Sequence, residues 1–202
     1  MMVIADIPAL TLFAWAIIGY AMGAVPFGIL LSRVMGLGDL RKLGSGNIGA
    51  TNVLRTGNKT AAALTLLLDA GKGMAAVVLA RVWAGEEAAQ IAAMAALIGH
   101  CFPVTLKFKG GKGTATFLGV ALGLYWPVGL ACCATWLATA KLIRISSLSA
   151  LVAAASSVFW LAVFGHPQLI GLYAVLALLV FERHRANISR LRAGTEPQIG
   201  QK

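Results

Sequence analysis

Two glycine-rich segments of the sequence combine residue types that bind phosphate. The first reads GSGNIGATNVLR and spans positions 44–55. Its glycines let backbone N–H groups approach an anion closely, and its hydroxyl, amide and guanidinium groups add side-chain donors. A flexible loop is the simpler interpretation, but a generic loop rarely holds so many donors in so short a stretch. We therefore predict an anion-binding segment whose members are Ser45, Gly46, Asn47, Thr51, Asn52 and Arg55.

The second segment reads FKGGKGT at 108–114 and follows GHCFP at 99–103. A glycine loop that runs into a new helix can bind an anion through N–H groups and the helix dipole. It is not a nucleotide-binding P-loop, because Gly113 stands where Ser or Thr is required and Leu106 where the first glycine is required. We predict phosphate binding by Gly110, Gly111, Lys112 and Gly113.

Two further polar clusters lie near the C-terminal half. Arg144-Ile145-Ser146-Ser147 places a cation beside hydroxyls, although a serine at this point is also ordinary at a helix start. RHRANISRL at 183–191 could be a simple basic stop after a membrane span. The presence of His184 and Asn187 among the arginines indicates more, because a histidine can donate to an oxyanion or transfer a proton near pH 7.

The composition requires a membrane around these clusters. Of 202 residues, 59% are hydrophobic and 12% charged, and the mean hydropathy is +0.82. The uncharged runs are about as long as spans or helical hairpins and lack the alternation of barrel strands. They cover 7–32, 88–106, 113–140 and 145–181. We expect the first run to be a retained span, because it is too long for a cleaved signal peptide and has no basic residue before it.

The charge distribution and the cysteine spacing argue against a nucleic-acid-binding protein, a metal site and a disulfide-stabilised fold. The net charge of +10 comes from short loops between apolar runs, so it indicates membrane orientation and anionic substrates, not nucleic acid. Cys101, Cys132 and Cys133 show neither metal-ligand spacing nor an even disulfide framework. We expect no metal and no cofactor.

The distribution of cations decides the number of spans. If the run 113–140 breaks at Tyr125-Trp126-Pro127 and the run 145–181 at Gly165-His166-Pro167, one side of the membrane holds 15 of the 17 Lys and Arg residues. Without the first break, each side holds eight. The positive-inside rule favours the break. We predict an all-α polytopic membrane protein with seven transmembrane helices, the fourth and fifth short, the N-terminus outside and the C-terminus cytoplasmic.

Two charged residues fall inside the second predicted span. Asp69 and Lys72 lie three positions apart on a helix, so they can pair and reduce their cost in the membrane. Structural pairing and support of the site are equally consistent with this spacing. His100 precedes the glycine loop and could brace it, whereas His166 falls in an outer turn.

The four clusters closely resemble those of the PlsY family, the acyl-phosphate:glycerol-3-phosphate acyltransferases of bacterial inner membranes. The matching motifs are GSGNIGATNVLR at 44–55, GHCFPVTLKFKGGKGTAT at 99–116, the segment around Ser147, and RHRANISRL at 183–191. With the span pattern, the likeness covers nearly the whole chain. Ala24 stands where relatives often carry Ser.

The resemblance implies one membrane-embedded acyltransferase domain over 1–202, with its active site at the cytoplasmic face. It implies acyl transfer from acyl phosphate to glycerol 3-phosphate, giving lysophosphatidic acid and inorganic phosphate. Because the sequence shows no Ser–His–acid triad on one loop and acyl phosphate is already activated, we expect direct attack without an acyl-enzyme, with either the leaving phosphate or His184 as proton acceptor. A soluble partner, PlsX, would make the donor. By the motif match, the residues that would line the polar site are Ser45, Thr51, Arg55, Lys112, Ser147, His184 and Asn187. We predict catalysis by Lys112, His184 and Asn187, and substrate binding by Ser147 and the other residues named above.

Two other classes remain open from the residues themselves. A transporter of phosphorylated solutes also needs basic loops and many spans, although transporters usually place polar sites near the midplane within inverted repeats. A scaffold that binds anionic membrane lipid needs charge but no ordered pattern of Gly, Ser, Asn and Thr.

Overall fold

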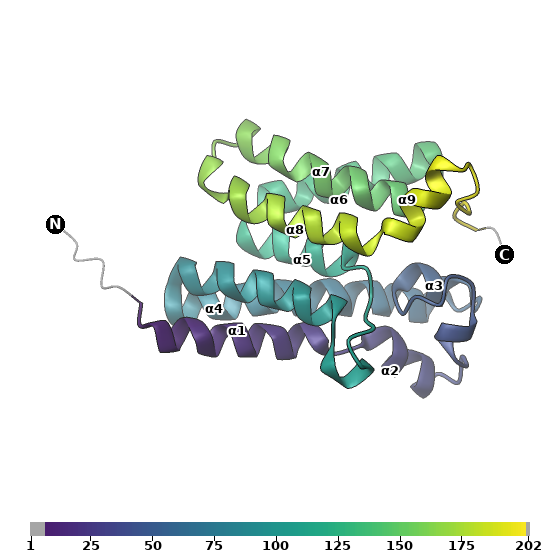
Figure 1. Cartoon of the computed structure of the whole chain (residues 1–202), viewed down its shortest axis with the longest axis horizontal. Helices are drawn as coiled ribbons and strands as arrows, with labels where there is room; N and C mark the ends of the chain where they lie inside the picture. The colour runs from purple at the N-terminus through teal and green to yellow at the C-terminus, as the bar shows by residue number, and fades with distance from the viewer. Residues whose placement is uncertain (1–6, 201–202) are drawn as a thin grey trace.

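The computed structural model describes residues 7–200, and over that range the regular secondary structure is helical (Figure 1). The α-helices are α1 (Ala9–Ala24), α2 (Phe27–Val34), α3 (Ala50–Leu54), α4 (Lys59–Cys101), α5 (Thr114–Leu124), α6 (Trp126–Ile143), α7 (Ser146–Val163), α8 (Ile170–Arg183) and α9 (Arg185–Arg192). Three 3₁₀ turns, η1 (Leu40–Lys42), η2 (Val104–Leu106) and η3 (Pro167–Leu169), lie between them. The all-α prediction is confirmed for this range.

Helix α4 is a hairpin of two arms. Its 43 residues would extend about 65 Å if straight, twice the thickness of a bilayer core. Gly85 interrupts it with φ 82° and ψ −172°, and Figure 1 shows the chain turning back there, at the end of the bundle opposite α3. Arg81 stabilises this turn by pairing with Glu86 and donating to the carbonyl of Leu124 at 2.9 Å.

Small residues let the helices of the bundle approach closely. A Cβ added at Gly19 or Gly23 of α1 would overlap the backbone of Ala92 or Ala96 in the second arm of α4. A Cβ at Gly119 of α5 would overlap the Ala70 carbonyl in the first arm. Such contacts are typical of helix packing in membranes, where small residues replace hydrophobic burial as the basis of close association. They hold α4 between α1 and α5.

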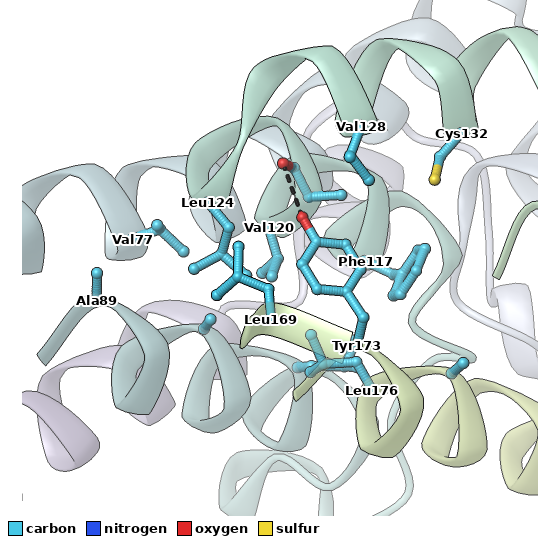
Figure 2. Packing of buried hydrophobic residues seen from close by; sticks show 14 of the residues in the cluster. Val77, Ala89, Phe117, Val120, Leu124, Val128, Cys132, Leu169, Tyr173 and Leu176 are labelled. Carbon is cyan, nitrogen blue, oxygen red and sulfur yellow. Dashed lines mark hydrogen bonds between the residues drawn. The ribbon is translucent and has the colours of Figure 1, made fainter. Parts of the chain in front are cut away.

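The predicted break before Pro127 is confirmed. Tyr125 adopts an extended conformation between α5 and α6, and Pro127 occupies the first turn of α6, where a missing N–H costs little. Behind this break, Tyr173 of α8 donates to the carbonyl of Ala121 from within the apolar core (Figure 2). The prediction that both flanking helices are short holds for α5, with 11 residues, but is wrong for α6, which has 18.

The chain also breaks between α7 and α8 and between α1 and α2. The chain separates α7 from α8 at 164–169, as predicted from Gly165-His166-Pro167. The first predicted span, in contrast, bends at Val25 and Pro26 into α1 and α2, because a proline at that point removes a helical hydrogen bond.

Four helical stretches of the described chain are long and apolar enough to cross a membrane. They are Ala9–Val34, Lys59–Leu106, Trp126–Ile143 and Ser146–Val163. Large apolar side chains such as Leu10, Trp83 and Leu178 are exposed on the outside of the bundle. A surface of this kind is stable against lipid and not against water.

Candidate active site

A cavity of about 450 Å³ brings the predicted polar clusters together at one end of the bundle, where α3 and α9 both lie (Figure 1). Among the predicted site residues, those that line it are Ser45, Asn47, Thr51, Asn52, Arg55, Lys112, Gly113, Ser147, His184 and Asn187. Gly46, Gly110 and Gly111 do not line it. Segments far apart in the sequence therefore converge as expected.

The first glycine-rich segment is organised by Asn52. Its buried amide donates to the carbonyls of Leu40 and Leu43 at 2.9 and 3.0 Å, and its Oδ1 accepts from Ser45 N–H and from Arg55 Nη1, both at 3.3 Å. The prediction that this amide donates to a substrate therefore needs correction, because both of its hydrogens already have acceptors. Asn52 instead fixes the loop and orients Arg55 toward the cavity.

The second glycine-rich segment also differs from the prediction. Gly110 N–H donates to the Cys101 carbonyl at 3.1 Å and Gly111 N–H to the His100 carbonyl at 3.0 Å. The Arg183 guanidinium donates to the carbonyls of the same two glycines. Because these N–H groups are engaged within the chain, Gly110 and Gly111 shape the loop and do not offer donors to an anion.

Backbone N–H groups that are free of intrahelical acceptors lie slightly further along the chain, at the start of α5. Gly113, with φ 85°, precedes α5 without a side-chain cap, and Thr114 and Ala115 of the first helical turn line the cavity. The N–H groups of a first turn have no intrahelical acceptors, and the helix dipole favours negative charge there. The start of α5 is therefore better placed than the N–H groups of Gly110 and Gly111 to offer donors to an anion.

Lys112 places a cation next to this helix start. Burial lowers the pKa of its ammonium from 10.5 to about 8, although Glu196 raises it in part, and nearby Arg190, Arg55 and Arg183 lower it further. The side chain is therefore mostly charged at pH 7 and loses its proton in mild alkali. A cation so incompletely neutralised by its surroundings attracts an anionic ligand strongly.

His184 is buried at the junction of α8 and α9. Its Nδ1 lies 2.8 Å from the Val180 carbonyl, and because a carbonyl only accepts, Nδ1 bears the proton and Nε2 has the lone pair. Burial lowers the pKa of His184 to about 4, with Lys112 and Arg183 acting in the same direction against the hydrogen bond to Val180 and the charge of Glu196. This imidazole is therefore neutral at pH 7 and a weaker base than an ordinary histidine, and proton transfer by His184 stays a prediction.

Glu196 is a site residue that sequence reasoning missed. Its carboxylate accepts from Ser147 Oγ at 2.6 Å, from Asn187 Nδ2, and from Arg190 Nε at 2.7 Å. Burial acts to raise its pKa, but these three donors lower it below its ordinary value. One signal was available, since Glu196 is the single acid among the four arginines and the lysine of 183–202.

An apolar arm continues from the polar end of the cavity. It runs between the first arm of α4, α5 and α6, and its lining residues are Leu66, Ala70, Leu118, Leu122, Cys133, Trp136 and Leu137. Leu122 lies eight residues from the start of α5, so the arm reaches about 12 Å along that helix. Within the described chain, no cluster of His, Cys, Asp and Glu side chains is placed to hold a metal ion.

A polar end that suits phosphate, continuous with an apolar arm inside a bundle of apolar helices, fits the class of integral membrane proteins that handle a phosphorylated compound and a lipid chain. Comparison with known proteins gives the family. The family model "Glycerol-3-phosphate acyltransferase" matches residues 13–194, and the chain belongs to this family, which is the PlsY family. Membership decides against the transporter and scaffold alternatives.

Individual relatives agree with that assignment. Glycerol-3-phosphate acyltransferase from Ruegeria pomeroyi is 66% identical over 197 residues, covering 98% of this chain and 97% of the relative. The protein of the same name from Roseobacter denitrificans is 58% identical over 201 residues, a share of 100% of each chain when rounded.

Two crystal structures of PlsY share the fold. The glycerol 3-phosphate form has a TM-score of 0.88 and 35% identity, covering 94% of this chain and 96% of the other. The lysophosphatidic acid form has a TM-score of 0.87 and 34% identity, covering 94% and 95%. The chain is therefore an integral membrane glycerol-3-phosphate acyltransferase.

Proposed function

We propose that the acyl donor is acyl phosphate, made by the soluble enzyme PlsX, and that the acyl group passes directly to glycerol 3-phosphate without an acyl-enzyme. The observation that carries this proposal is a single cavity with Arg55 and Lys112 at its polar end, besides Arg190, which is paired with Glu196, and an apolar arm beyond. Two phosphorylated substrates require this much positive charge in one place. The arm offers an apolar surface to the acyl chain.

The polar residues divide between the phosphates and the glycerol hydroxyls. Arg55, Lys112 and the first turn of α5 bind phosphate, and Ser45 and Thr51 add hydroxyl donors. Asn187 lines the cavity, and its buried Oδ1 has no hydrogen-bond partner within residues 7–200. A buried acceptor of this kind is stabilised by a ligand donor, and a glycerol hydroxyl is one.

The reaction then needs little from the protein beyond positioning and charge. The free glycerol hydroxyl oxygen attacks the acyl carbonyl carbon, a new ester C–O bond forms, and the bond between that carbon and the phosphate oxygen breaks. The departing phosphate takes the hydroxyl proton, since His184 is a weak base with a pKa of about 4. Arg55 and Lys112 stabilise the negative charge that develops on the phosphate. Ser147 Oγ donates to Glu196, so its role is to position the C-terminal tail beside the site.

The proposal includes the membrane topology. We propose a single domain over 1–202 in the bacterial inner membrane, with seven crossings made by α1 with α2, the two arms of α4, and α5 to α8. The N-terminus is then outside, and the C-terminus and the cavity face the cytoplasm. The charge asymmetry supports this, because 15 of the 17 Lys and Arg residues fall on the cytoplasmic side.

The test uses purified protein with acyl phosphate and glycerol 3-phosphate, following inorganic phosphate and lysophosphatidic acid together. Equal amounts of the two products, and no product from acyl-CoA, are expected. Phosphate release that is independent of glycerol 3-phosphate, or turnover with acyl-CoA at a comparable rate, contradicts the proposal. In the same assay, His184→Gln separates the two candidate proton acceptors: a retained kcat supports the phosphate, and a collapse of kcat with unchanged KM supports the histidine.

A further inference from the structure

Three titratable side chains of α4 lie together inside the bundle, and two of them, Asp69 and His100, also line the cavity that holds the phosphate-binding segments. Lys72 Nζ donates to Asp69 Oδ1 at 2.6 Å and to the Val25 carbonyl at 2.7 Å, and His100 Nδ1 lies 3.8 Å from the same Asp69 oxygen. Each of the three side chains is at least nine-tenths buried. Asp69 and Lys72 belong to the first arm of α4 and His100 to the second, so this cluster, called the α4 cluster below, joins both arms to the bend after α1. Such groups are costly inside a membrane and mark function more often than packing.

The α4 cluster touches the chain on both sides of Lys112. Before it, the His100 imidazole packs directly on Gly111, where an added Cβ would overlap Nε2, and the His100 carbonyl accepts from Gly111 N–H at 3.0 Å. After it, the Asp69 carbonyl accepts from Thr116 Oγ1 at 2.9 Å in the first turn of α5. The cation and the helix start that bind phosphate are therefore both set against this cluster.

We propose that Asp69, Lys72 and His100 are positioning residues for acyl transfer. They hold the segment from Gly111 to Thr116 so that the Lys112 ammonium and the N–H groups of α5 face the same phosphate. This inference rests on the role proposed above for Lys112. The two are distinguished by Lys112→Met: an unchanged KM for glycerol 3-phosphate in that variant contradicts the role of Lys112 itself, whatever the α4 cluster does.

The first test is a double-mutant cycle between His100 and Gly111, read from the KM for glycerol 3-phosphate. In the wild-type background, Gly111→Ala pushes a methyl group into the imidazole, and we expect KM to rise about tenfold. In the His100→Ala background the obstructing ring is absent, so adding Gly111→Ala should raise KM by less than about threefold. Equal effects of Gly111→Ala in the two backgrounds would show that the imidazole does not transmit the change.

The second test uses a matched ion pair and remains informative if His100→Ala does not fold. Asp69→Asn with Lys72→Met removes the buried pair without leaving one charge alone, and we expect kcat/KM to fall about tenfold or more. The control is Arg81→Met with Glu86→Gln, which removes the pair at the opposite end of the bundle, beside Gly85. The control should lower the thermal midpoint while kcat/KM stays within about threefold of wild type. A cluster variant with wild-type kcat/KM, or a control that loses as much, overturns the proposal.

Discussion

The depressed pKa of Lys112 makes a quantitative prediction about pH. With a pKa of about 8, this ammonium is about nine-tenths charged at pH 7 and about one-tenth charged at pH 9. If the charged form binds phosphate, kcat/KM for glycerol 3-phosphate should fall about tenfold for each pH unit above 8, because kcat/KM reports the free enzyme. The measurement is the initial rate of lysophosphatidic acid formation from pH 6 to 10, corrected for spontaneous hydrolysis of the donor.

The contribution of Lys112 to the stability of the fold should rise over the alkaline pH range in which activity falls. This difference distinguishes loss of activity by titration of Lys112 from loss of activity by unfolding. Because the folded pKa of Lys112 is lowered, the unfolded chain binds more protons than the folded one between about pH 8 and 10.5, so this residue makes folding more favourable as the pH rises. Loss of activity with a constant or rising thermal midpoint is therefore expected from this group.

The matched variant is Lys112→Arg. A guanidinium stays charged throughout the range, so the alkaline fall near pH 8 should disappear even if the absolute rate is lower. If kcat/KM of this variant still falls near pH 8, the alkaline fall does not come from Lys112. That result would also refute the argument that burial lowers the pKa of Lys112 to about 8.

Other predictions concern the tail, the apolar arm and the helix contacts. Glu196→Gln should lower the free energy of unfolding by about 2 kcal/mol, since it weakens charge-assisted hydrogen bonds. Because the folded pKa of Glu196 is lowered, the wild type should keep this advantage down to about pH 4.5, the ordinary value, and lose it as the pH falls further; thermal unfolding in detergent at pH 7 and at a series of values below 4.5 measures both. Cys133→Trp should fill part of the apolar arm. If the indole keeps two methylenes of the acyl chain out of the arm, binding of a long-chain donor loses about 1.6 kcal/mol, which lowers kcat/KM about fifteenfold. A series of donors of different chain length measures this, and short-chain donors should be unaffected. Gly119→Ala should cost about 1–3 kcal/mol because its Cβ meets the Ala70 backbone, whereas Gly171→Ala, which faces open space, should be neutral or slightly stabilising; equal effects of the two would contradict the packing argument.

Much of the fold is predictable because membrane spans have simple requirements. Uncharged runs of the right length identify helices, and the asymmetry of cations together with Pro127 identifies the break at Tyr125, which a hydropathy pattern alone would miss. The bend before α2 was not predicted, because Pro26 lies within an unbroken apolar run and its effect depends on what packs there. In the structure, Lys72 binds the Val25 carbonyl freed at this bend.

The sequence predicts which residues form the site better than it predicts what each residue does there. Residue types and spacing marked Arg55, Lys112 and the other members of the polar end, and the structure brings ten of the thirteen marked residues to one cavity. Which atoms are free to bind a ligand depends on tertiary partners that no spacing shows. The Asn52 amide and the N–H groups of Gly110 and Gly111 are engaged by carbonyls elsewhere in the fold, and a donor-rich motif looks the same whether its donors face a ligand or the protein.

A rapid-quench experiment tests the central claim most directly, namely that both substrates occupy one site and react with each other. Enzyme is mixed with excess acyl phosphate in the absence of glycerol 3-phosphate, and phosphate release is followed over the first turnovers. Direct transfer predicts no burst and no acylated protein, followed by prompt formation of lysophosphatidic acid when glycerol 3-phosphate is added. A burst of phosphate equal to the enzyme concentration, with the acyl group bound to the protein, would contradict it.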